Sequence, residues 1–170
     1  MAKQKEIKTN AMRILDRLKI SYTHQSYECG EFVDGIETAD KLGLPHELVY
    51  KTLVTAGAKG QYFVFVLPIE EELDMKKAAK AVGEKSVSMI HVKDITAVTG
   101  YVRGGCTAVG MKKQYKTVIS HKAEKLEQMY VSGGKIGCQI KLSPMDLCRA
   151  VSGSFGDILV EPHLSLTSSL

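Results

Sequence analysis

Hydrophobic residues at the start of the chain follow a helical spacing and then a strand-like one. Ile14, Leu15 and Leu18 recur at intervals of one, three and four residues, and Asn10 stands where an N-cap is expected. Residues 20–27, which follow at once, are rich in β-branched and aromatic side chains. The chain is therefore predicted to begin with a helix and continue into a strand.

The clearest β pattern lies in two runs, residues 49–54 and 61–67, whose hydrophobic side chains occupy both alternating positions. Residues 57–60 connect them and contain two glycines, which is typical of a hairpin turn. A strand that is hydrophobic on both faces has to be covered by other parts of the protein on both faces. This pair is therefore predicted to form the centre of a sheet.

The remaining pattern predicts short elements. Further helices are expected at residues 36–42, 73–82, 92–98 and from Pro144 to Gly153, and further strands at residues 86–90, 117–120, 129–131 and 137–142. The expected caps are Asp74 and Ser143 at N-termini and Gly43, Gly83 and Gly153 at C-termini. Residues 29–34 are expected to form a loop and residues 164–170 a frayed tail. The order predicts an α+β fold in which residues 1–170 form one domain, with a central, curved, mixed but mostly antiparallel sheet of six to eight strands flanked by short helices.

Composition narrows the functional classes. The chain has 170 residues, of which 44% are hydrophobic and 25% charged, and its longest hydrophobic run, residues 63–67, is far shorter than the roughly 20 residues of a membrane span. Its first residues lack the hydrophobic region of a signal peptide. We therefore expect a cytoplasmic protein with no membrane partner. The net charge of +4 is basic, but too small to coat nucleic acid by charge alone.

The four cysteines do not form a metal or disulfide pattern. Cys29, Cys106, Cys138 and Cys148 include no C-x-x-C pair, and no histidine pair stands at metal-ligand spacing. They are expected to be reduced thiols that pack as small hydrophobic residues. The sequence predicts no metal and no cofactor.

The glycine-rich residues 100–113 are predicted to form a loop or a strand broken by glycine. Adjacent backbone N–H groups in such a loop can bind an anion or an oxyanion, although a tight turn between two elements explains the glycines equally well. Gly105 and Gly110 have the spacing of a phosphate-binding P-loop. Met111 occupies the position of the required lysine, so nucleoside triphosphate hydrolysis is disfavoured.

Lys51 is unusual because it lies inside a strand that is hydrophobic on both faces. Its ammonium either reaches solvent at the strand end or is held in a cleft to bind phosphate or a developing oxyanion. Arg103, Lys112, Lys113 and Lys116 add positive charge near the glycine-rich loop, which makes a polyanionic ligand plausible. A nucleophilic Cys106 with His91 or His121 as its base is a weaker hypothesis, because nothing in the spacing supports that pairing.

Several stretches taken in order resemble the YbaK/EbsC family of free-standing aminoacyl-tRNA editing domains. They are LGL at 42–44, VYKTL at 49–53, LDMKKAAK at 73–80, TGYVRGG at 99–105, GMKK at 110–113 and YVSGGKIG at 130–137. The resemblance covers nearly the whole chain. It implies the YbaK-like fold and a deacylase that removes cysteine from proline tRNA, or other small aminoacyl groups. The implied partners are the acceptor end of an aminoacylated tRNA and, as a candidate, prolyl-tRNA synthetase.

The same resemblance assigns site residues. Lys51 matches a lysine that contacts the acceptor end, and Gly104 and Gly105 match a loop whose amides face the aminoacyl ester. The substrate-binding residues it implies are Tyr27, Cys106, Thr107, Ser132 and Gly133. This chain has Thr107 and Ala108 where the family usually has serine and proline. It has Gln139 where some relatives have aspartate, so no acid–base role transfers to that position.

Three functions follow from these patterns. In the first, a cysteinyl ester is attacked by its own thiolate, and the enzyme only has to orient the ester and stabilise the oxyanion with loop amides and Lys51. This hypothesis explains why no conventional triad is found. The alternatives are a non-catalytic module that binds tRNA or a synthetase, and a thiol hydrolase that depends on Cys106.

Overall fold

The structure is a computed structural model that describes residues 8–28 and 34–161. Its helices are α1 (Asn10–Arg17), α2 (Gly35–Leu42), α3 (Met75–Ala81), α4 (Ile95–Thr99) and α5 (Pro144–Val151), with 3₁₀ turns at His46–Leu48, Val92–Asp94 and His121–Lys125. Its strands are β1 (Thr23–Ser26), β2 (Tyr50–Gly57), β3 (Tyr62–Pro68), β4 (Val87–Met89), β5 (Lys116–Ser120), β6 (Met129–Ser132), β7 (Cys138–Leu142) and β8 (Ser154–Gly156). Cys29, most of the expected loop at 29–34 and the expected tail at 164–170 lie outside the described residues.

The larger sheet has the strand order β4-β2-β3-β5-β8, so the β2–β3 hairpin lies inside it, as predicted. Antiparallel pairing joins β2 to β3 and β4, whereas β5 is parallel to both β3 and β8. The two faces of β3 pack into two different hydrophobic cores. Val64 and Val66 face one of them, while Phe63, Phe65 and Leu67 face the other, together with α3. This double burial explains the uninterrupted hydrophobic run.

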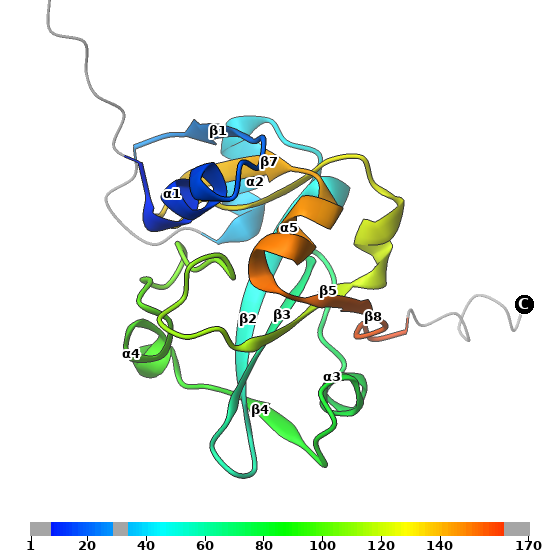
Figure 1. Cartoon of the computed structure of the whole chain (residues 1–170). Helices are drawn as coiled ribbons and strands as arrows, with labels where there is room; N and C mark the ends of the chain where they lie inside the picture. Colours follow the sequence, from blue (N-terminus) through cyan, green and yellow to red (C-terminus); the bar gives the residue numbers. More distant parts are fainter. Residues whose placement is uncertain (1–7, 29–33, 162–170) are drawn as a thin grey trace, which may run out of the picture.

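A second sheet has the order β1-β7-β6, and all its pairs are antiparallel. The expected single central sheet is therefore divided in two, although the α+β class and its mostly antiparallel, mixed pairing are confirmed. A parallel bridge between Val49 and Tyr130 connects the sheets at the start of β2. Figure 1 shows β1 and β7 with α1 at the top of the molecule and the β2–β3 hairpin running down from them toward β4.

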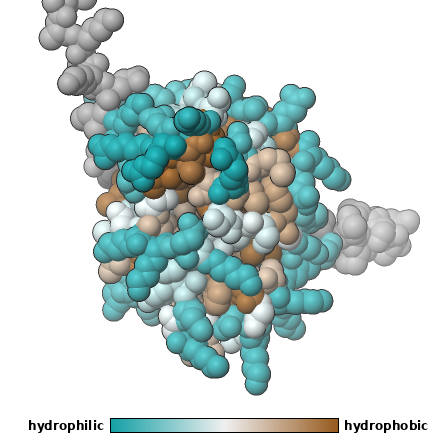
Figure 2. Space-filling model, in the orientation of Figure 1, coloured by the Kyte–Doolittle hydropathy of each residue, from teal (hydrophilic) through white to brown (hydrophobic). Residues whose placement is uncertain are grey.

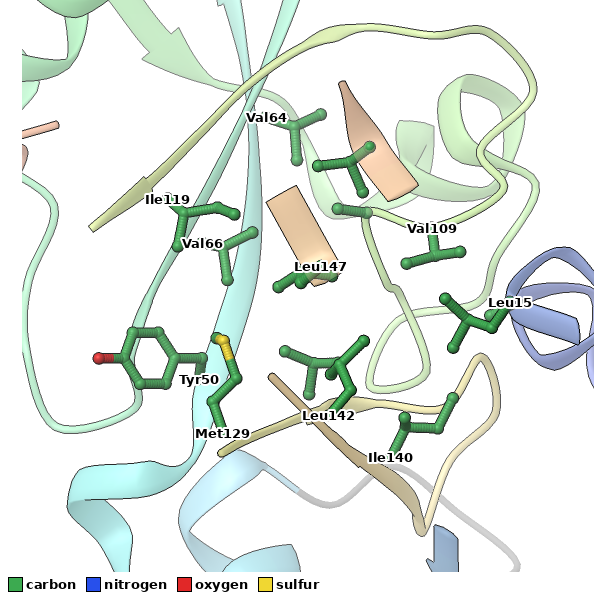
Figure 3. Close-up of a cluster of buried hydrophobic side chains, with 14 of the residues drawn as sticks. Leu15, Tyr50, Val64, Val66, Val109, Ile119, Met129, Ile140, Leu142 and Leu147 are labelled. Atoms are coloured by element: carbon green, nitrogen blue, oxygen red, sulfur yellow. The ribbon is translucent and has the colours of Figure 1, made fainter. Parts of the chain in front are cut away.

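The main core fills the space between the two sheets (Figure 3). Ile140 and Leu142 from β7 and Leu147 from α5 meet Val66 and Ile119 of the larger sheet, and none of these five side chains is more than 1% exposed. Burial of each large hydrophobic side chain contributes about 1.5–3 kcal/mol. The two sheets therefore form one packed body. On the face shown in Figure 2, hydrophobic groups lie between hydrophilic side chains.

The helix ends follow the predicted caps, with three corrections. The C-terminal cap of α3 is Val82, one residue before the expected Gly83. Asp74 accepts hydrogen bonds from the first turn of α3, and Ser143 does the same for α5. The cap of α1 is Thr9, whose hydroxyl accepts from the Met12 N–H, and not Asn10, which donates instead to the carbonyl of Gly110. The C-terminal cap of α5 is Ser152 in a left-handed conformation, one residue before the expected Gly153.

Three features differ from the sequence-based expectation because they depend on distant partners. β1 covers only Thr23–Ser26, the segment that pairs with β7, and not all of residues 20–27. The predicted helix at 92–98 is divided into a 3₁₀ turn and α4. β8 exists because three residues after α5 pair with β5, and three residues are too few to leave a recognisable pattern in the sequence.

Candidate active site

A cavity of about 210 Å³ lies where the start of β2 meets the smaller sheet, and α2 covers it. Its lining comes from the cap and first turn of α2, from Val49 and the first half of β2, from the residue that follows β3, from the glycine-rich loop and from the β6–β7 pair. The lining residues are Asp34, Gly35, Thr38, Val49, Tyr50, Lys51, Thr52, Leu53, Ile69, Gly104, Cys106, Ser132 and Gln139. The cavity thus brings together four of the predicted site residues, namely Lys51, Gly104, Cys106 and Ser132.

The β6–β7 pair contributes the polar floor of the cavity. Cys138, Ile140 and Leu142 face the core, so strand alternation turns Gln139 to the opposite face. Ser132 is the register partner of Gln139 on β6 and lies on the same face. The Ser132 hydroxyl accepts a hydrogen bond from the Gly134 N–H at 3.2 Å, and this contact fixes the turn that follows β6.

Lys51 brings a cation to the cavity. Its side chain is half-buried and its ammonium donates to the carbonyl oxygen of Ile69 at 3.3 Å. Desolvation by burial lowers the pKa of Lys51, and the charges of Glu72 and Glu71 act in the opposite direction. The ammonium makes one hydrogen bond to the described residues, so its other N–H groups are available to bind an anion.

The glycine-rich loop is tightly anchored. Gly104 has a φ of +86°, a conformation that favours glycine, and it lines the cavity. A Cβ on Gly105 would lie 2.8 Å from backbone atoms of Lys135, so this glycine lets two loops approach closely. The Gly105 N–H donates to the carbonyl of Val102 at 3.0 Å and is thus engaged within the turn. The Tyr101 hydroxyl donates to the carbonyl of Val109 at 2.6 Å, and this buried hydrogen bond connects the two ends of the loop.

The thiol of Cys106 is poorly suited to act as a nucleophile. Burial raises its pKa to about 11, so the thiol is protonated at neutral pH. Neither His91 nor His121 is among the residues that line the cavity, and the described part of the chain places no histidine there. The cavity therefore offers Cys106 no histidine base among the described residues.

The other predicted site residues, Tyr27, Gly105, Thr107 and Gly133, are not among the residues that line the cavity. The Tyr27 hydroxyl is 3.5 Å from the hydroxyl of Thr38, which does line the cavity. Thr107 is 1% exposed, and its hydroxyl accepts from the Val109 N–H. Gly133 packs directly on the Cys138 sulfur, and its N–H donates to the Cys138 carbonyl at 2.8 Å.

Sequence reasoning missed the contribution of α2. Asp34 caps this helix by accepting from the Glu37 N–H at 2.8 Å, and Gly35 and Thr38 line the cavity from its first turn. No local pattern could have identified them, because their role depends on how α2 docks. For Gln139 a signal existed, since a polar residue between two hydrophobic ones in a strand points away from the core.

Residues 8–28 and 34–161 show neither a metal site nor a membrane-spanning helix. No group of three or more histidine, cysteine, aspartate or glutamate side chains is arranged to hold a metal ion. None of the helices described there has the length and hydrophobicity needed to cross a membrane.

Comparison with solved structures shows which fold surrounds this cavity. A protein provisionally described as a trans-editing enzyme for prolyl-tRNA synthetase superposes with a TM-score of 0.76 at 18% identity, over 92% of this chain and 100% of the other. A protein described only as hypothetical superposes with a TM-score of 0.80 at 18% identity, over 89% and 99% of the two chains. The fold is therefore that of editing-domain structures.

Sequence comparison extends this result to the family. A protein of Enterococcus faecalis, provisionally named the Cys-tRNA(Pro)/Cys-tRNA(Cys) deacylase EbsC, is 42% identical over 93% of this chain and 98% of its own length. The resemblance to YbaK/EbsC proteins is thus confirmed. The family model described as the aminoacyl-tRNA editing domain matches residues 33–150, and this chain belongs to that family.

Proposed function

We propose that this protein is a trans-acting deacylase that removes cysteine wrongly attached to proline tRNA. Membership of the editing-domain family and the name of the 42% identical relative support an aminoacyl-tRNA substrate. The observation that carries the proposal is the half-buried ammonium of Lys51 in a cavity of about 210 Å³ beside the glycine-rich loop. A cavity of this size suits a small aminoacyl group, with the tRNA acceptor end outside it.

The proposed reaction uses the thiol of the substrate. This thiol loses its proton, its sulfur forms a bond to the ester carbonyl carbon, and the bond from that carbon to the 3′ oxygen of the tRNA breaks. The leaving oxygen takes up a proton, and water then hydrolyses the cyclic thioester to free cysteine. Because the ester is already activated, the protein has to orient the reacting groups and stabilise the oxyanion.

Two groups are proposed for that stabilisation. The Gly104 amide lies at the cavity and is the glycine N–H that we assign to the oxyanion, since the Gly105 N–H donates to Val102. The Lys51 ammonium supplies positive charge for the oxyanion or for a phosphate of the acceptor end. Ser132 forms the floor against which the aminoacyl group rests.

A panel of misacylated tRNAs tests the activity. We expect Cys-tRNA(Pro) to be deacylated and Lys51→Ala to reduce the rate by at least tenfold, because loss of a charge-assisted contact is worth about 1.5–3 kcal/mol. Lys59→Ala, in the exposed turn of the same hairpin, is the matched control and should leave the rate unchanged. Full activity in folded Lys51→Ala would refute the proposed site, and tRNA binding without deacylation of any substrate would favour a non-catalytic module.

A second variant separates the substrate thiol from the enzyme thiol. Since the Cys106 thiol is protonated at neutral pH, Cys106→Ala should keep most of the activity. Complete loss of activity with an unchanged unfolding temperature would instead support the thiol hydrolase. Within this proposal the protein acts in the cytoplasm, where tRNAs are charged, and prolyl-tRNA synthetase is the proposed supplier of the substrate.

A further inference from the structure

The side-chain carbonyl oxygen of Gln139 lacks a hydrogen bond, and the proposed reaction does not explain it. Gln139 is 8% exposed, and its Oε1 atom is buried with no partner among the described residues. An unsatisfied buried acceptor is unfavourable, and native proteins leave few of them. Such an atom at a cavity points to a ligand that completes it.

Three neighbouring polar groups of the cavity each make one hydrogen bond within the protein. The Lys51 ammonium donates to the Ile69 carbonyl, the Ser132 hydroxyl accepts from Gly134, and Asp34 Oδ1 accepts from the Glu37 N–H. Gln139 lies on the same strand face as Ser132 and lines the cavity. The unpaired acceptor therefore belongs to a side chain that lines the cavity, within reach of a bound group once the amide rotates.

An aminoacyl ester offers few donors to such an acceptor. Its carbonyl and ester oxygens only accept, and a thiol is a weak donor. Its α-ammonium group carries charged N–H donors, whose hydrogen bonds are about twice as strong as neutral ones. We infer that Gln139 accepts a hydrogen bond from the substrate α-ammonium and so selects esters with a free α-amino group. This inference rests on the proposed deacylase function.

The selection has a direct chemical consequence. A peptidyl or N-acylated tRNA carries an amide at the same position, which has a single neutral N–H and additional bulk. Such a tRNA would give Oε1 a weaker hydrogen bond, and we expect the enzyme not to deacylate it. Holding the α-ammonium also fixes Cα, which places the ester carbonyl toward the glycine-rich loop.

The test compares Cys-tRNA(Pro) with 3-mercaptopropionyl-tRNA(Pro), which keeps the thiol and lacks the amine. We expect the wild-type protein to deacylate the cysteinyl ester at least about tenfold faster. Gln139→Met has nearly the same side-chain shape and no acceptor. It should lower the rate on the cysteinyl ester to that on the amine-free ester, and should leave the latter unchanged.

Stability of the free protein gives an independent readout. Because Oε1 is unpaired without substrate, Gln139→Met should unfold at the same or a higher temperature. Gln139→Glu keeps an acceptor and should retain the preference for the amine. Gln25→Met, at the exposed register partner on β1, is the matched control and should change neither rate.

Three results would overturn the inference: an equal loss on both esters in Gln139→Met, a lowered unfolding temperature in that variant, or an amine preference that Asp34→Asn abolishes and Gln139→Met retains. Binding of an amide-linked cysteinyl-adenosine analogue, with and without its amino group, separates the two proposals. No deacylation of any ester would refute the proposed function. Equal binding of the two analogues would refute the role of Gln139.

Discussion

The two sides of the cavity are held by different kinds of contact. The glycine-rich loop and the β6–β7 turn approach each other through backbone atoms, since Gly105 lies against Lys135 with no room for a side chain. On the other side, α2 rests on a small hydrophobic cluster that includes Ala39, Val49 and Ile69, and an exposed ion pair joins its end to the β3–α3 loop. From these contacts we expect the first side to be rigid and the second to adjust more easily when the cavity is filled.

The largest effect is expected from Gly105→Ala, which breaks the rigid side. The new Cβ would meet the Lys135 backbone at 2.8 Å, and backbone cannot move aside as a flexible side chain can. We expect destabilisation of about 3 kcal/mol, at the upper end for overpacking, and loss of deacylation. Chemical denaturation and a single-turnover assay measure the two effects.

Gly60→Ala is the control for that variant. Its φ of +81° also favours glycine, but no atom lies within 4 Å of the added Cβ, so only about 1 kcal/mol of backbone strain is expected. Equal destabilisation of the two variants would show that the loops separate easily, and the rigid side would then not exist as described.

A smaller effect on the same side is expected from Tyr101→Phe. The Tyr101 hydroxyl is buried and donates to the Val109 carbonyl at 2.6 Å, so its removal leaves a buried acceptor unpaired. Destabilisation of about 2 kcal/mol is expected. Tyr115→Phe removes a similar bond, to the Val98 carbonyl at 2.7 Å, from a more exposed site and should cost less. A larger destabilisation by Tyr115→Phe than by Tyr101→Phe would indicate that the hydrogen bond between Tyr101 and Val109 does not hold the loop together.

The contrast also explains what the sequence could predict. The patterns predicted the β2–β3 hairpin, the caps at Asp74 and Ser143 and the position of Lys51 within a strand, because each of these depends on residues close together in the chain. The division into two sheets depends on the bridge between Val49 and Tyr130, which are 81 positions apart in the numbering of the chain. Such a long-range pairing leaves no local signal.

The same reasoning applies within the cavity. The family resemblance led to Lys51, Gly104 and Ser132, which line it, because they belong to recognisable motifs. The contribution of α2 could not be predicted, because a helix of eight residues shows which face is hydrophobic but not which strand it will cover. Alternation along β7 turns Gln139 away from the core, yet only the assembled cavity shows that its oxygen lacks a partner.

On the adjustable side, Asp34→Ala removes the N-cap of α2, which is expected to destabilise the protein by about 1 kcal/mol. Since α2 covers the cavity, KM for the aminoacyl-tRNA should rise severalfold while kcat changes little. Asp74→Ala removes the equivalent cap of α3, which packs in a separate core, and should destabilise similarly without a change in KM. A rise in KM for both variants would show that general loosening is responsible, and not the position of α2.

The smallest effect is expected at the ion pair that joins α2 to the β3–α3 loop. The His46 imidazole lies 2.6 Å from Asp40 and 2.9 Å from Glu70, and its pKa is raised above 6.5, chiefly by the hydrogen bond to Asp40 and further by Glu70. Because the pKa is higher in the folded state than in the unfolded state, protonation stabilises the fold. That contribution is complete below pH 6.5 and is lost as the pH rises through the folded-state pKa.

His46→Gln should therefore unfold at a lower temperature than the wild type near pH 6, and the difference should shrink toward pH 8.5. A difference for His46→Gln that grew with pH would mean that the neutral imidazole, and not the ion pair, holds α2 in place.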